Sequence, residues 1–323
     1  MRHALVLRLS ALGDVIHTLP AVEALRVAHP GVEISWVVEA PYRELVETVA
    51  GVRAIPVRMK TWGRSAIASR REIRDALRAM RGADASIDFQ GLVKSAALGW
   101  LSGAALRFGF DSAAIREKPA LLFTNRKAHV DTSKHVVEQN IELALWTAAA
   151  VNVGAPPARP GPSLDARDDK NHWEEFADGR GLEELAGAVV LLPGAGKPIK
   201  LWPLERFRTL AKQLGPQALA VWGPGERELA EGIGARMAPP TNLRELAWLL
   251  KNARLVVGAD TGPLHLAAAL GTPVVGLYGP TDPRRNGPWG QIANAVDHFR
   301  STKLMESITV EEVVKTIEQV IAP

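Results

Sequence analysis

The 323-residue sequence contains no cysteine. Disulfide bridges, thiolate metal sites and cysteine nucleophiles are therefore excluded, and the composition fits a reducing compartment. The sequence also has no uninterrupted apolar run near the ~20 residues that a membrane-spanning helix needs. The apolar run that follows Met1 is too short for the core of a signal peptide. We therefore expect a soluble, cytoplasmic protein.

Motifs of several common enzyme classes are also absent. The sequence has no Asp-x-Asp pair for a metal-bound nucleotide, no His-Glu-x-x-His and no Gly-x-Ser-x-Gly. The dinucleotide-binding glycine fingerprint fails because Ile199 stands where its third glycine is required, and Gly196-Lys197 lacks the earlier glycine of a P-loop. These absences disfavour metal-dependent transferases, zinc hydrolases, esterases and nicotinamide dehydrogenases.

Length and composition indicate a globular protein with two domains. A chain of 323 residues is longer than one ordinary hydrophobic core organises. Hydrophobic residues make up 47% of the sequence and charged residues 23%, which is typical of folded proteins rather than disordered ones.

The net charge of +4 is unevenly distributed. Residues 1–160 hold 21 Lys and Arg against 15 Asp and Glu, a net charge of +6, whereas residues 161–323 have a net charge of −2. The excess gathers in residues 53–81, where nine basic side chains face two acidic ones. Such a field attracts anions: nucleic acid, an acidic membrane surface, or a phosphorylated or carboxylated substrate. For Arg70–Arg81 we favour the plainer interpretation of a solvated helix face.

The hydrophobic pattern repeats one plan in both halves of the chain. Runs typical of strands occur at residues 4–9, 32–38, 85–89, 188–192, 218–222, 255–257 and 274–278. Helical patterns alternate with them, and the first helix is predicted to start at Val15. This alternation indicates parallel βαβ units. We therefore predict an α/β fold of two doubly wound domains facing a cleft, with ligands beyond the carboxyl ends of the strands.

The densest proline stretch, Gly154–Pro162, separates the two halves. Such a segment is stiff and extended, so we predict that it links domains 1–160 and 161–323. Near the end of the chain, Thr309 and Glu312 have the spacing of a capping box. They predict a final helix over residues 309–321.

Asp14 is the first candidate for chemistry because it stands in the turn after the first predicted strand. Its simplest role is to cap the helix that starts at Val15. Alternatively, its carboxylate projects into the cleft and accepts a proton from a hydroxyl nucleophile. The sequence leaves both roles open.

Two turns of the second half suit an anionic ligand. Gly194-Ala195-Gly196 follows a strand and precedes Lys200, as suits a backbone that approaches phosphate closely, although a plain surface turn is an equal alternative. Asp260-Thr261-Gly262 joins a strand to a helix whose N-terminus offers unpaired N–H groups to an anion. Asp260 or Thr261 could instead only cap this helix, and for Thr261 we favour capping. His265, considered alone, is more typical of an ordinary core histidine.

Three segments carry a resemblance to a known family: Ser10–Pro20 (SALGDVIHTLP), Asp260–Leu266 (DTGPLHL) and Tyr278–Pro283 (YGPTDP). In this order they resemble the ADP-heptose:lipopolysaccharide heptosyltransferases over nearly the whole chain. Two further segments, Asp88–Ser95 and Leu122–Lys127, are most similar to heptosyltransferase I, which glycosylates the first Kdo sugar.

The resemblance implies a GT-B fold, in which two Rossmann-like domains face a central cleft. The N-terminal domain would bind the acceptor and the C-terminal domain the nucleotide sugar. It also implies ADP-heptose as the donor, inversion at the anomeric carbon, and neither metal nor cofactor. Asp14 matches the catalytic base. The matches to donor-binding residues are Gly194, Ala195, Gly196, Lys200, Glu226, Asp260, Thr261, Gly262 and His265.

One segment departs from the family pattern. Family members often carry hydroxyl residues before the lysine, where this chain has Gly194-Ala195-Gly196. Those side-chain contacts are therefore lost or replaced by backbone N–H groups.

The acceptor implied by the resemblance, Kdo-lipid A, carries carboxylates and phosphates, which agrees with the basic first half. We expect this acceptor, rather than nucleic acid, to contact basic residues of that half: Arg58, Lys60, Arg64, Lys94 and Arg116. Because the acceptor is a lipid, a peripheral contact with the cytosolic face of the inner membrane is compatible with the cytoplasmic expectation.

Two other functions stay open. A heptosyltransferase II, or a related heptosyltransferase with a different acceptor, would share every donor motif. A non-catalytic two-lobed sugar-binding protein would share the paired domains and the cleft, but it would normally need an export signal.

Overall fold

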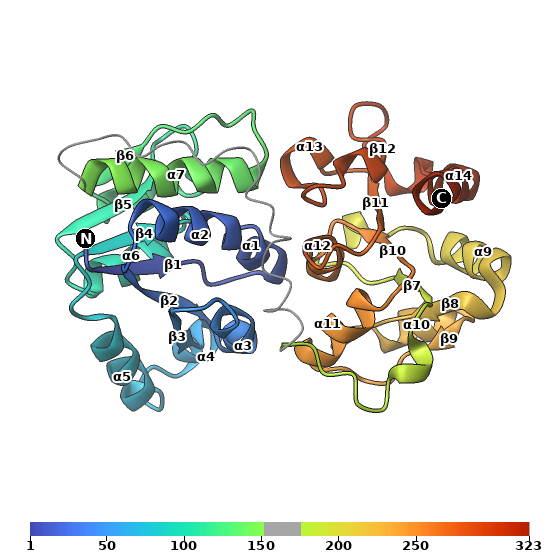
Figure 1. The fold of residues 1–323 in the computed structure, drawn as a ribbon, viewed down its shortest axis with the longest axis horizontal. Helices are drawn as coiled ribbons and strands as arrows, with labels where there is room; N and C mark the ends of the chain where they lie inside the picture. Colours follow the sequence, from blue (N-terminus) through green and yellow to red (C-terminus); the bar gives the residue numbers. More distant parts are fainter. Residues whose placement is uncertain (152–175, 323) are drawn as a thin grey trace. The chain divides into compact units, whose positions relative to one another are not determined.

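The computed structural model describes residues 1–151 and 176–322. The chain divides into two compact units, Met1–Ala166 and Arg167–Pro323, and each is built on one parallel sheet (Figure 1). The segment Gly154–Pro162 and the domain boundary predicted at residue 160 lie outside the described residues.

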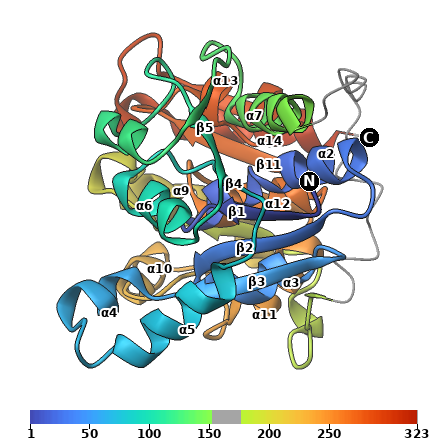
Figure 2. The same cartoon turned by 90° about the vertical axis from the view of Figure 1, so that its left-hand side faces the viewer.

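The first unit contains a six-stranded sheet with the order β3-β2-β1-β4-β5-β6, and Figure 2 looks onto this unit. Its strands are β1 (His3–Leu7), β2 (Glu33–Glu39), β3 (Val52–Val57), β4 (Ala85–Asp88), β5 (Leu106–Phe110) and β6 (Arg126–Ala128). Its helices are α1 (Leu12–Ile16), α2 (Leu19–Ala28), α3 (Arg43–Glu47), α4 (Met59–Arg64), α5 (Arg70–Met80), α6 (Val93–Leu101) and α7 (Val136–Val151).

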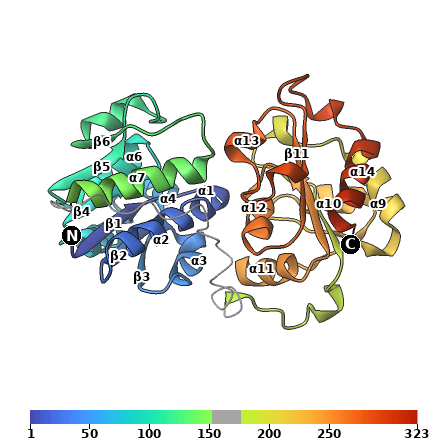
Figure 3. The same cartoon turned by 45° about the horizontal axis from the view of Figure 1, so that its top comes forward.

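Both faces of this sheet are covered, as a parallel sheet requires. Leu5 and Leu7 of β1 share a core cluster with Met80 of α5 and Leu98 of α6. Ala4 and Val6 alternate with them along the strand, so they point to the opposite face, and they are fully buried as well. α2 and α7 pack against each other, and α7 contacts β5 and β6 (Figures 1 and 3).

The second unit contains a six-stranded sheet with the order β12-β11-β10-β7-β8-β9. Its strands are β7 (Val189–Leu192), β8 (Ala218–Ala220), β9 (Arg236–Met237), β10 (Leu255–Ala259), β11 (Val274–Tyr278) and β12 (Ala295–Asp297). Its helices are α9 (Leu204–Leu214), α10 (Arg227–Ile233), α11 (Leu243–Lys251), α12 (Gly262–Ala269), α13 (Pro283–Asn286) and α14 (Val310–Ile321). Taken in chain order within its own unit, this is the same strand order as in the first sheet.

The C-terminal helix shows how the sequence defines an element of this unit. The Thr309 side chain accepts a hydrogen bond from the Glu312 N–H at 3.2 Å, and the Glu312 carboxylate accepts one from the Thr309 N–H at 2.8 Å. This is the predicted capping box. Val313 and Ile317 on one face of α14 are buried in the core cluster that also contains Phe207 of α9.

The first helical segment differs from its prediction. Instead of one helix from Val15, the chain forms α1 and then α2, and Pro20 lies in the first turn of α2. Proline has no N–H to continue α1, whereas the first turn of a helix tolerates it. Asp14 therefore lies inside α1, and Ala11 occupies the N-cap position. The predicted capping role of Asp14 is wrong.

Each sheet has one point at which the direction of strand addition reverses. It lies between β1 and β4 in the first unit and between β7 and β10 in the second. In open α/β sheets, ligands bind beyond the carboxyl ends of the strands at this point. Asp14 follows β1, and in the second unit Gly194 follows β7 while Asp260 follows β10. The fold thus places the candidate residues of each half at the edge where a ligand is expected.

Candidate active site

Asp14 is held by two guanidinium groups in the first unit. Arg8 donates from Nη2 to Asp14 Oδ1 at 2.6 Å. Arg116 donates from Nη2 to the same oxygen at 3.0 Å and from Nη1 to Oδ2 at 3.1 Å. Burial alone would raise the pKa of Asp14, but the charges of Arg8 and Arg116 and their hydrogen bonds outweigh it and lower the pKa. Asp14 is therefore an ionised carboxylate, and the two guanidinium groups hold it in that form.

Arg8 is the fixed member of this group. It lies just after β1, its side chain is only 2% exposed, and it also donates to the backbone carbonyl of Phe89. Burial lowers the pKa of Arg8, and the negative charge of Asp14 opposes this effect. Because a buried cation needs a partner, Arg8 and Asp14 stabilise each other.

The turn after β1 is tied to the turn after β4 through Gln90. The Gln90 side chain accepts from the N–H of Leu9 at 2.7 Å and donates to the carbonyl of Ser10 at 2.7 Å. Asp88, the last residue of β4, accepts from the N–H groups of Gln90 at 2.9 Å and Gly91 at 3.2 Å. Burial raises the pKa of Asp88 to about 6, against the hydrogen bonds and the charge of Arg8.

Two of the predicted acceptor residues come together near Glu39. Lys60 lies in the first turn of α4, after β3, and Lys94 lies in the first turn of α6, after β4. Both side chains are exposed. Burial raises the pKa of Glu39 at the end of β2, and the charges of Lys94 and Lys60 partly oppose this. Lys60, Lys94 and Asp14 thus follow strands at the same edge of the first sheet.

The other predicted acceptor residues have different surroundings. Arg58 is exposed after β3 and approaches Glu72 at 3.7 Å. Arg64, at the end of α4, is exposed and forms no ion pair within the described part of the chain. Arg116 forms an ion pair with Asp14 at 3.0 Å, so it lies beside the candidate base.

In the second unit, Asp260 joins the loops that follow β7 and β10. Lys200 Nζ donates to Asp260 Oδ2 at 2.6 Å. His265 Nε2 lies 2.9 Å from Asp260 Oδ1, and since a carboxylate only accepts, this nitrogen carries the hydrogen. Burial would raise the pKa of Asp260, but His265 and Lys200 lower it to about 2. His265 is buried, yet it has a specific partner in the loop.

Thr261 occupies the N-cap position of α12, but its side chain makes no capping hydrogen bond. Its hydroxyl oxygen is buried and has no hydrogen-bond partner among the described residues. Gly262 begins the helix, whose N-terminus carries a partial positive charge. The predicted position of Thr261 at the start of the helix is confirmed, whereas side-chain capping by Thr261 is wrong.

Glu226 connects the loop after β8 with the loop after β7. Its carboxylate accepts from the N–H of Gly223 at 2.9 Å. A Cβ atom on Gly194 would lie 2.0 Å from Glu226 Cδ, so the carboxylate occupies the space that a side chain at 194 would fill. Ala195 is partly buried and Gly196 is exposed, and no side-chain contact defines their roles.

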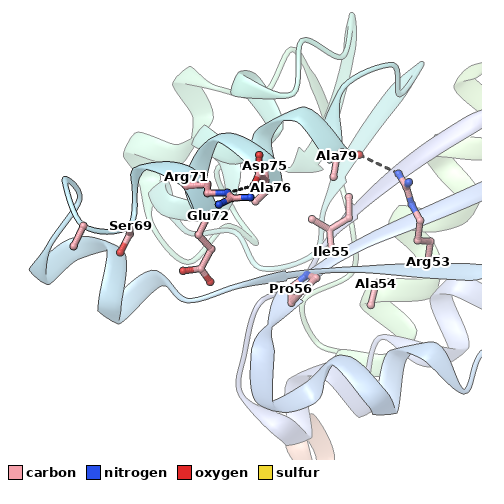
Figure 4. Close-up of a pocket in the computed structure, with 11 residues that line it drawn as sticks. Arg53, Ala54, Ile55, Pro56, Ser69, Arg71, Glu72, Asp75, Ala76 and Ala79 are labelled. Carbon is pink, nitrogen blue, oxygen red and sulfur yellow. Dashed lines mark hydrogen bonds and ion pairs between the residues drawn. The ribbon is translucent and has the colours of Figure 1, made fainter.

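A hollow of about 660 Å³ lies away from these residues, between β3 and α5 (Figure 4). Its floor includes Ile55 and Ala76. Its charged side chains have protein partners: Arg53 donates to the carbonyl of Ala79 at 3.0 Å, and Arg71 approaches Asp75 at 3.9 Å. None of the predicted site residues lines this hollow.

No group of three or more His, Asp or Glu side chains in residues 1–151 and 176–322 is arranged to hold a metal ion. Over the same ranges, every helix is too short or too polar to cross a membrane.

Two Rossmann-like sheets of identical strand order are the plan of the GT-B glycosyltransferases, and the chain has this fold. Residues 70–313 match the family model for glycosyltransferase family 9 (heptosyltransferase), and the chain belongs to this family. It is a glycosyltransferase, as the sequence predicts.

The similar proteins agree with this assignment. The chain is 36% identical over 303 residues to lipopolysaccharide heptosyltransferase 1 of Escherichia coli K12, over 89% of this chain and 91% of the relative. The solved structure of E. coli heptosyltransferase WaaC with ADP matches with a TM-score of 0.81 and 31% identity, over 98% of this chain and 99% of that chain. WaaC with ADP-2-deoxy-2-fluoro heptose matches with a TM-score of 0.77 and the same identity and coverage.

Sequence reasoning missed Arg8, Gln90 and Glu39. A charged residue within the apolar run 4–9 was a usable signal for Arg8, because a buried arginine requires a partner. Gln90 and Glu39 had no comparable local signal, since their importance depends on which strands become neighbours.

Proposed function

We propose that this enzyme transfers heptose from ADP-heptose to the first Kdo sugar of Kdo-lipid A, with inversion at the anomeric carbon. The observation that carries the proposal is Asp14, an ionised and partly exposed carboxylate at the reversal point of the first sheet. Basic side chains follow neighbouring strands at the same edge, as an anionic acceptor requires.

The proposed reaction needs one base and a stabilised leaving group. The acceptor hydroxyl oxygen attacks the anomeric carbon from the face opposite ADP, and its proton passes to Asp14. The bond between the anomeric carbon and the diphosphate oxygen breaks, and its electron pair leaves with ADP. Lys200 and the N-terminus of α12 stabilise the negative charge that develops there. The cleft in which the substrates meet stays a prediction.

Donor binding is supported by the set of groups around Asp260. Lys200, the unpartnered hydroxyl of Thr261 and the start of α12 offer a cation and donors to a diphosphate. Glu226 offers acceptor oxygens to ribose hydroxyls. We assign the nucleotide sugar to this unit and the acceptor to the first unit.

Calorimetry of ADP binding tests the donor site. Lys200→Ala should weaken ADP binding by at least ~10-fold, because it removes a charged donor and leaves the Asp260 carboxylate to repel the diphosphate. The matched control is Lys197→Ala, which removes an exposed lysine of the same turn and should change ADP affinity far less. Equal affinities for wild type and Lys200→Ala would remove Lys200 from the site.

Acceptor choice separates the proposal from its alternatives. Wild-type protein with ADP-heptose and Kdo-lipid A should give a product one heptose heavier by mass spectrometry. Activity only on an acceptor that already bears a heptose would favour heptosyltransferase II, and the absence of any ADP-heptose turnover would favour a sugar-binding protein. The transfer should persist after exhaustive chelation, and dependence on added magnesium would contradict the metal-free mechanism.

We further propose that the enzyme works in the cytoplasm and touches the cytosolic face of the inner membrane. We assign this contact to α5, in place of the plain solvated helix face that the sequence favours for Arg70–Arg81. Arg70, Arg74, Arg78 and Arg81 surround a hollow of about 450 Å³ that also includes the apolar side chains of Ile73 and Leu77. Ile67, just before the helix, is 84% exposed. α5 packs against the core through Ala76 and Met80, while its arginines stay exposed beside the partly buried Ile73 and Leu77. Exposed basic groups of this kind suit an anionic lipid surface.

A further inference from the structure

The two cations on Asp14 differ in their freedom to move. The Arg8 side chain is 2% exposed and is fixed by the carbonyl of Phe89 as well as by Asp14. The Arg116 side chain is 38% exposed, and within the described residues Asp14 is its sole hydrogen-bond partner. A ligand can therefore displace Arg116 from Asp14 without disturbing Arg8.

The backbone that carries Arg116 is nevertheless well anchored. The N–H of Glu117 donates to the carbonyl of Gly91 at 3.0 Å, and the Glu117 carboxylate accepts from the N–H of Val93 at 2.7 Å. Gly91 has a φ of +67°, and a Cβ there would lie 3.2 Å from the Arg116 nitrogen, so glycine permits this close approach. Only the side chain of Arg116, and not its backbone, needs to move for the guanidinium to leave Asp14.

The position of Arg116 conflicts with the proton transfer. Its guanidinium covers both oxygens of Asp14, so an incoming acceptor hydroxyl competes with Arg116 for the same carboxylate. An acceptor that carries an acid group can resolve this competition, because a second carboxylate offers Arg116 the same planar, bidentate partner.

We propose that Arg116 is a latch on Asp14 that the acceptor itself releases, as the acid group of the acceptor draws the guanidinium away and exposes Asp14 to the acceptor hydroxyl. The proposal rests on the proposed function and adds to it. Arg116 is then a positioning residue that couples acceptor recognition to activation of the base.

The charges around Asp14 explain why this coupling matters. Arg8 from the end of β1 and Arg116 from the segment after β5 face Asp14 directly, and Asp88 from the end of β4 faces Arg8. Removing one of two neighbouring cations raises the pKa of a carboxylate and makes it a stronger base. With the latch closed, Asp14 is a weak base towards water. Once the acceptor is seated, it becomes a stronger base towards the acceptor hydroxyl.

Carboxyl NMR of ¹³C-aspartate-labelled protein tests the latch, with the Asp14 signal assigned from Asp14→Asn. In the free enzyme, Arg116→Ala should move the titration midpoint of Asp14 upward. Saturating Kdo-lipid A in detergent should move it upward in wild type and less in Arg116→Ala, where no latch remains to release. Lys118→Ala removes the same charge from an exposed site two residues further on and should leave the Asp14 midpoint unchanged.

Each other outcome overturns the latch. An unchanged midpoint in free Arg116→Ala means that Arg116 does not hold Asp14. An equal shift on acceptor binding in both proteins means that the acceptor acts through its own charge. A wild-type enzyme that does not bind Kdo-lipid A contradicts both the latch and the proposed acceptor. Full activity of Asp14→Asn would refute the base assignment and with it the activating role of the latch, whereas the titration of Asp14 would still show whether the acceptor displaces Arg116.

The Arg116→Ala variant should also change the acceptor KM, and it should shift the pH dependence of kcat/KM but not that of kcat. Arg116→Ala should raise the acceptor KM by at least ~10-fold, because a charged partner is lost. The acid limb of kcat/KM, which reports on the free enzyme, should move upward relative to wild type, whereas the acid limb of kcat should not. Movement of both limbs together would mean that Arg116 stays on Asp14 throughout the reaction.

Discussion

At the scale of single residues, the contact with Glu226 explains why residue 194 is a glycine. The resemblance implies hydroxyl residues before the lysine, whereas here the space beside residue 194 is filled by the Glu226 carboxylate. The same carboxylate accepts the Gly223 N–H. A glycine at 194 therefore allows two loops of the second unit to meet, and it fixes the direction in which Glu226 points.

Gly194→Ala should weaken ADP binding by at least ~10-fold while changing thermal stability little. The new Cβ would lie 2.0 Å from Glu226 Cδ, so the flexible end of Glu226 must move, at small cost to the fold but at the expense of a donor contact. Calorimetry with ADP measures this. Gly196→Ala is the comparison, because its Cβ would meet no atom within 4 Å, and its loss of affinity should be far smaller. Unchanged ADP binding by folded Gly194→Ala would show that Glu226 does not contact the nucleotide.

Individual site residues were predictable where a turn follows a strand. Asp260 stands in such a turn, and Asp14 lies in the short helix α1 that directly follows β1. The structure gives each of them cationic partners. The residues that pair with Asp14 and Asp260 were harder to predict. Arg116 reaches Asp14 across 102 positions of sequence, and that pairing depends on how β5 lies relative to β1, which no local pattern encodes.

At the scale of elements, the carboxyl ends of β1 and β4 form one charged unit. The two strands pair in parallel, with Leu7 opposite Asp88. This register brings Arg8, just beyond β1, close to the buried carboxyl of Asp88 at the end of β4. Asp88 in turn accepts the N–H groups that shape the Gln90–Gly91 turn.

The raised pKa of Asp88 predicts a specific pH dependence of stability. Its value of about 6 in the folded protein exceeds the ordinary value of 3.8, so the folded state retains a proton that the unfolded state has released. Stability therefore falls as pH rises from about 4 to about 6, by about 3 kcal/mol in total. Asn at this position cannot ionise.

Chemical denaturation of wild type and Asp88→Asn at several pH values measures this effect. The free energy of unfolding of the first unit in Asp88→Asn, minus that of wild type, should grow by about 3 kcal/mol between pH 4 and pH 7. A difference that stays constant across this range would mean that Asp88 ionises normally in the folded protein.

Strands were easier to predict than helix boundaries. The apolar runs around β7, β10 and β11 are continuous because parallel strands are buried on both faces. The break between α1 and α2 was missed, since the apolar positions Val15, Leu19, Val22 and Leu25 keep helical spacing across it. Pro20 interrupts the backbone without interrupting that pattern.

At the scale of the whole molecule, the excess of basic residues in the first half of the sequence gathers in particular parts of the first unit. Arg58, Lys60 and Lys94 follow strand ends of the first sheet, whereas the arginines of α5 lie on a helix that contacts β3. Among the described residues, Arg70, Arg78 and Arg81 have no carboxylate within 4 Å. Arg58 approaches Glu72 of α5, so the two groups of cations are neighbours at that point. We assign the strand-end cations to the acceptor and the arginines of α5 to the membrane surface.

Binding to vesicles of phosphatidylglycerol and phosphatidylethanolamine tests the second assignment. Replacing Arg70, Arg74 and Arg78 with Gln should lower vesicle binding by about 100-fold, since each basic residue near such a surface contributes about 1 kcal/mol. The control replaces three exposed basic residues of the second unit, Lys212, Arg254 and Lys315, with Gln. Equal losses in the two variants would show that net charge, not α5, determines binding.

The central claim is that Asp14 takes the proton of the acceptor hydroxyl, and a single-turnover assay of Asp14→Asn tests it most directly. The variant should bind ADP with wild-type affinity, because the donor groups lie in the second unit. With saturating ADP-heptose and Kdo-lipid A, its rate of heptose transfer should fall at least ~10²-fold, the usual contribution of a general base. A folded Asp14→Asn protein that transfers heptose at a near-normal rate would contradict the account.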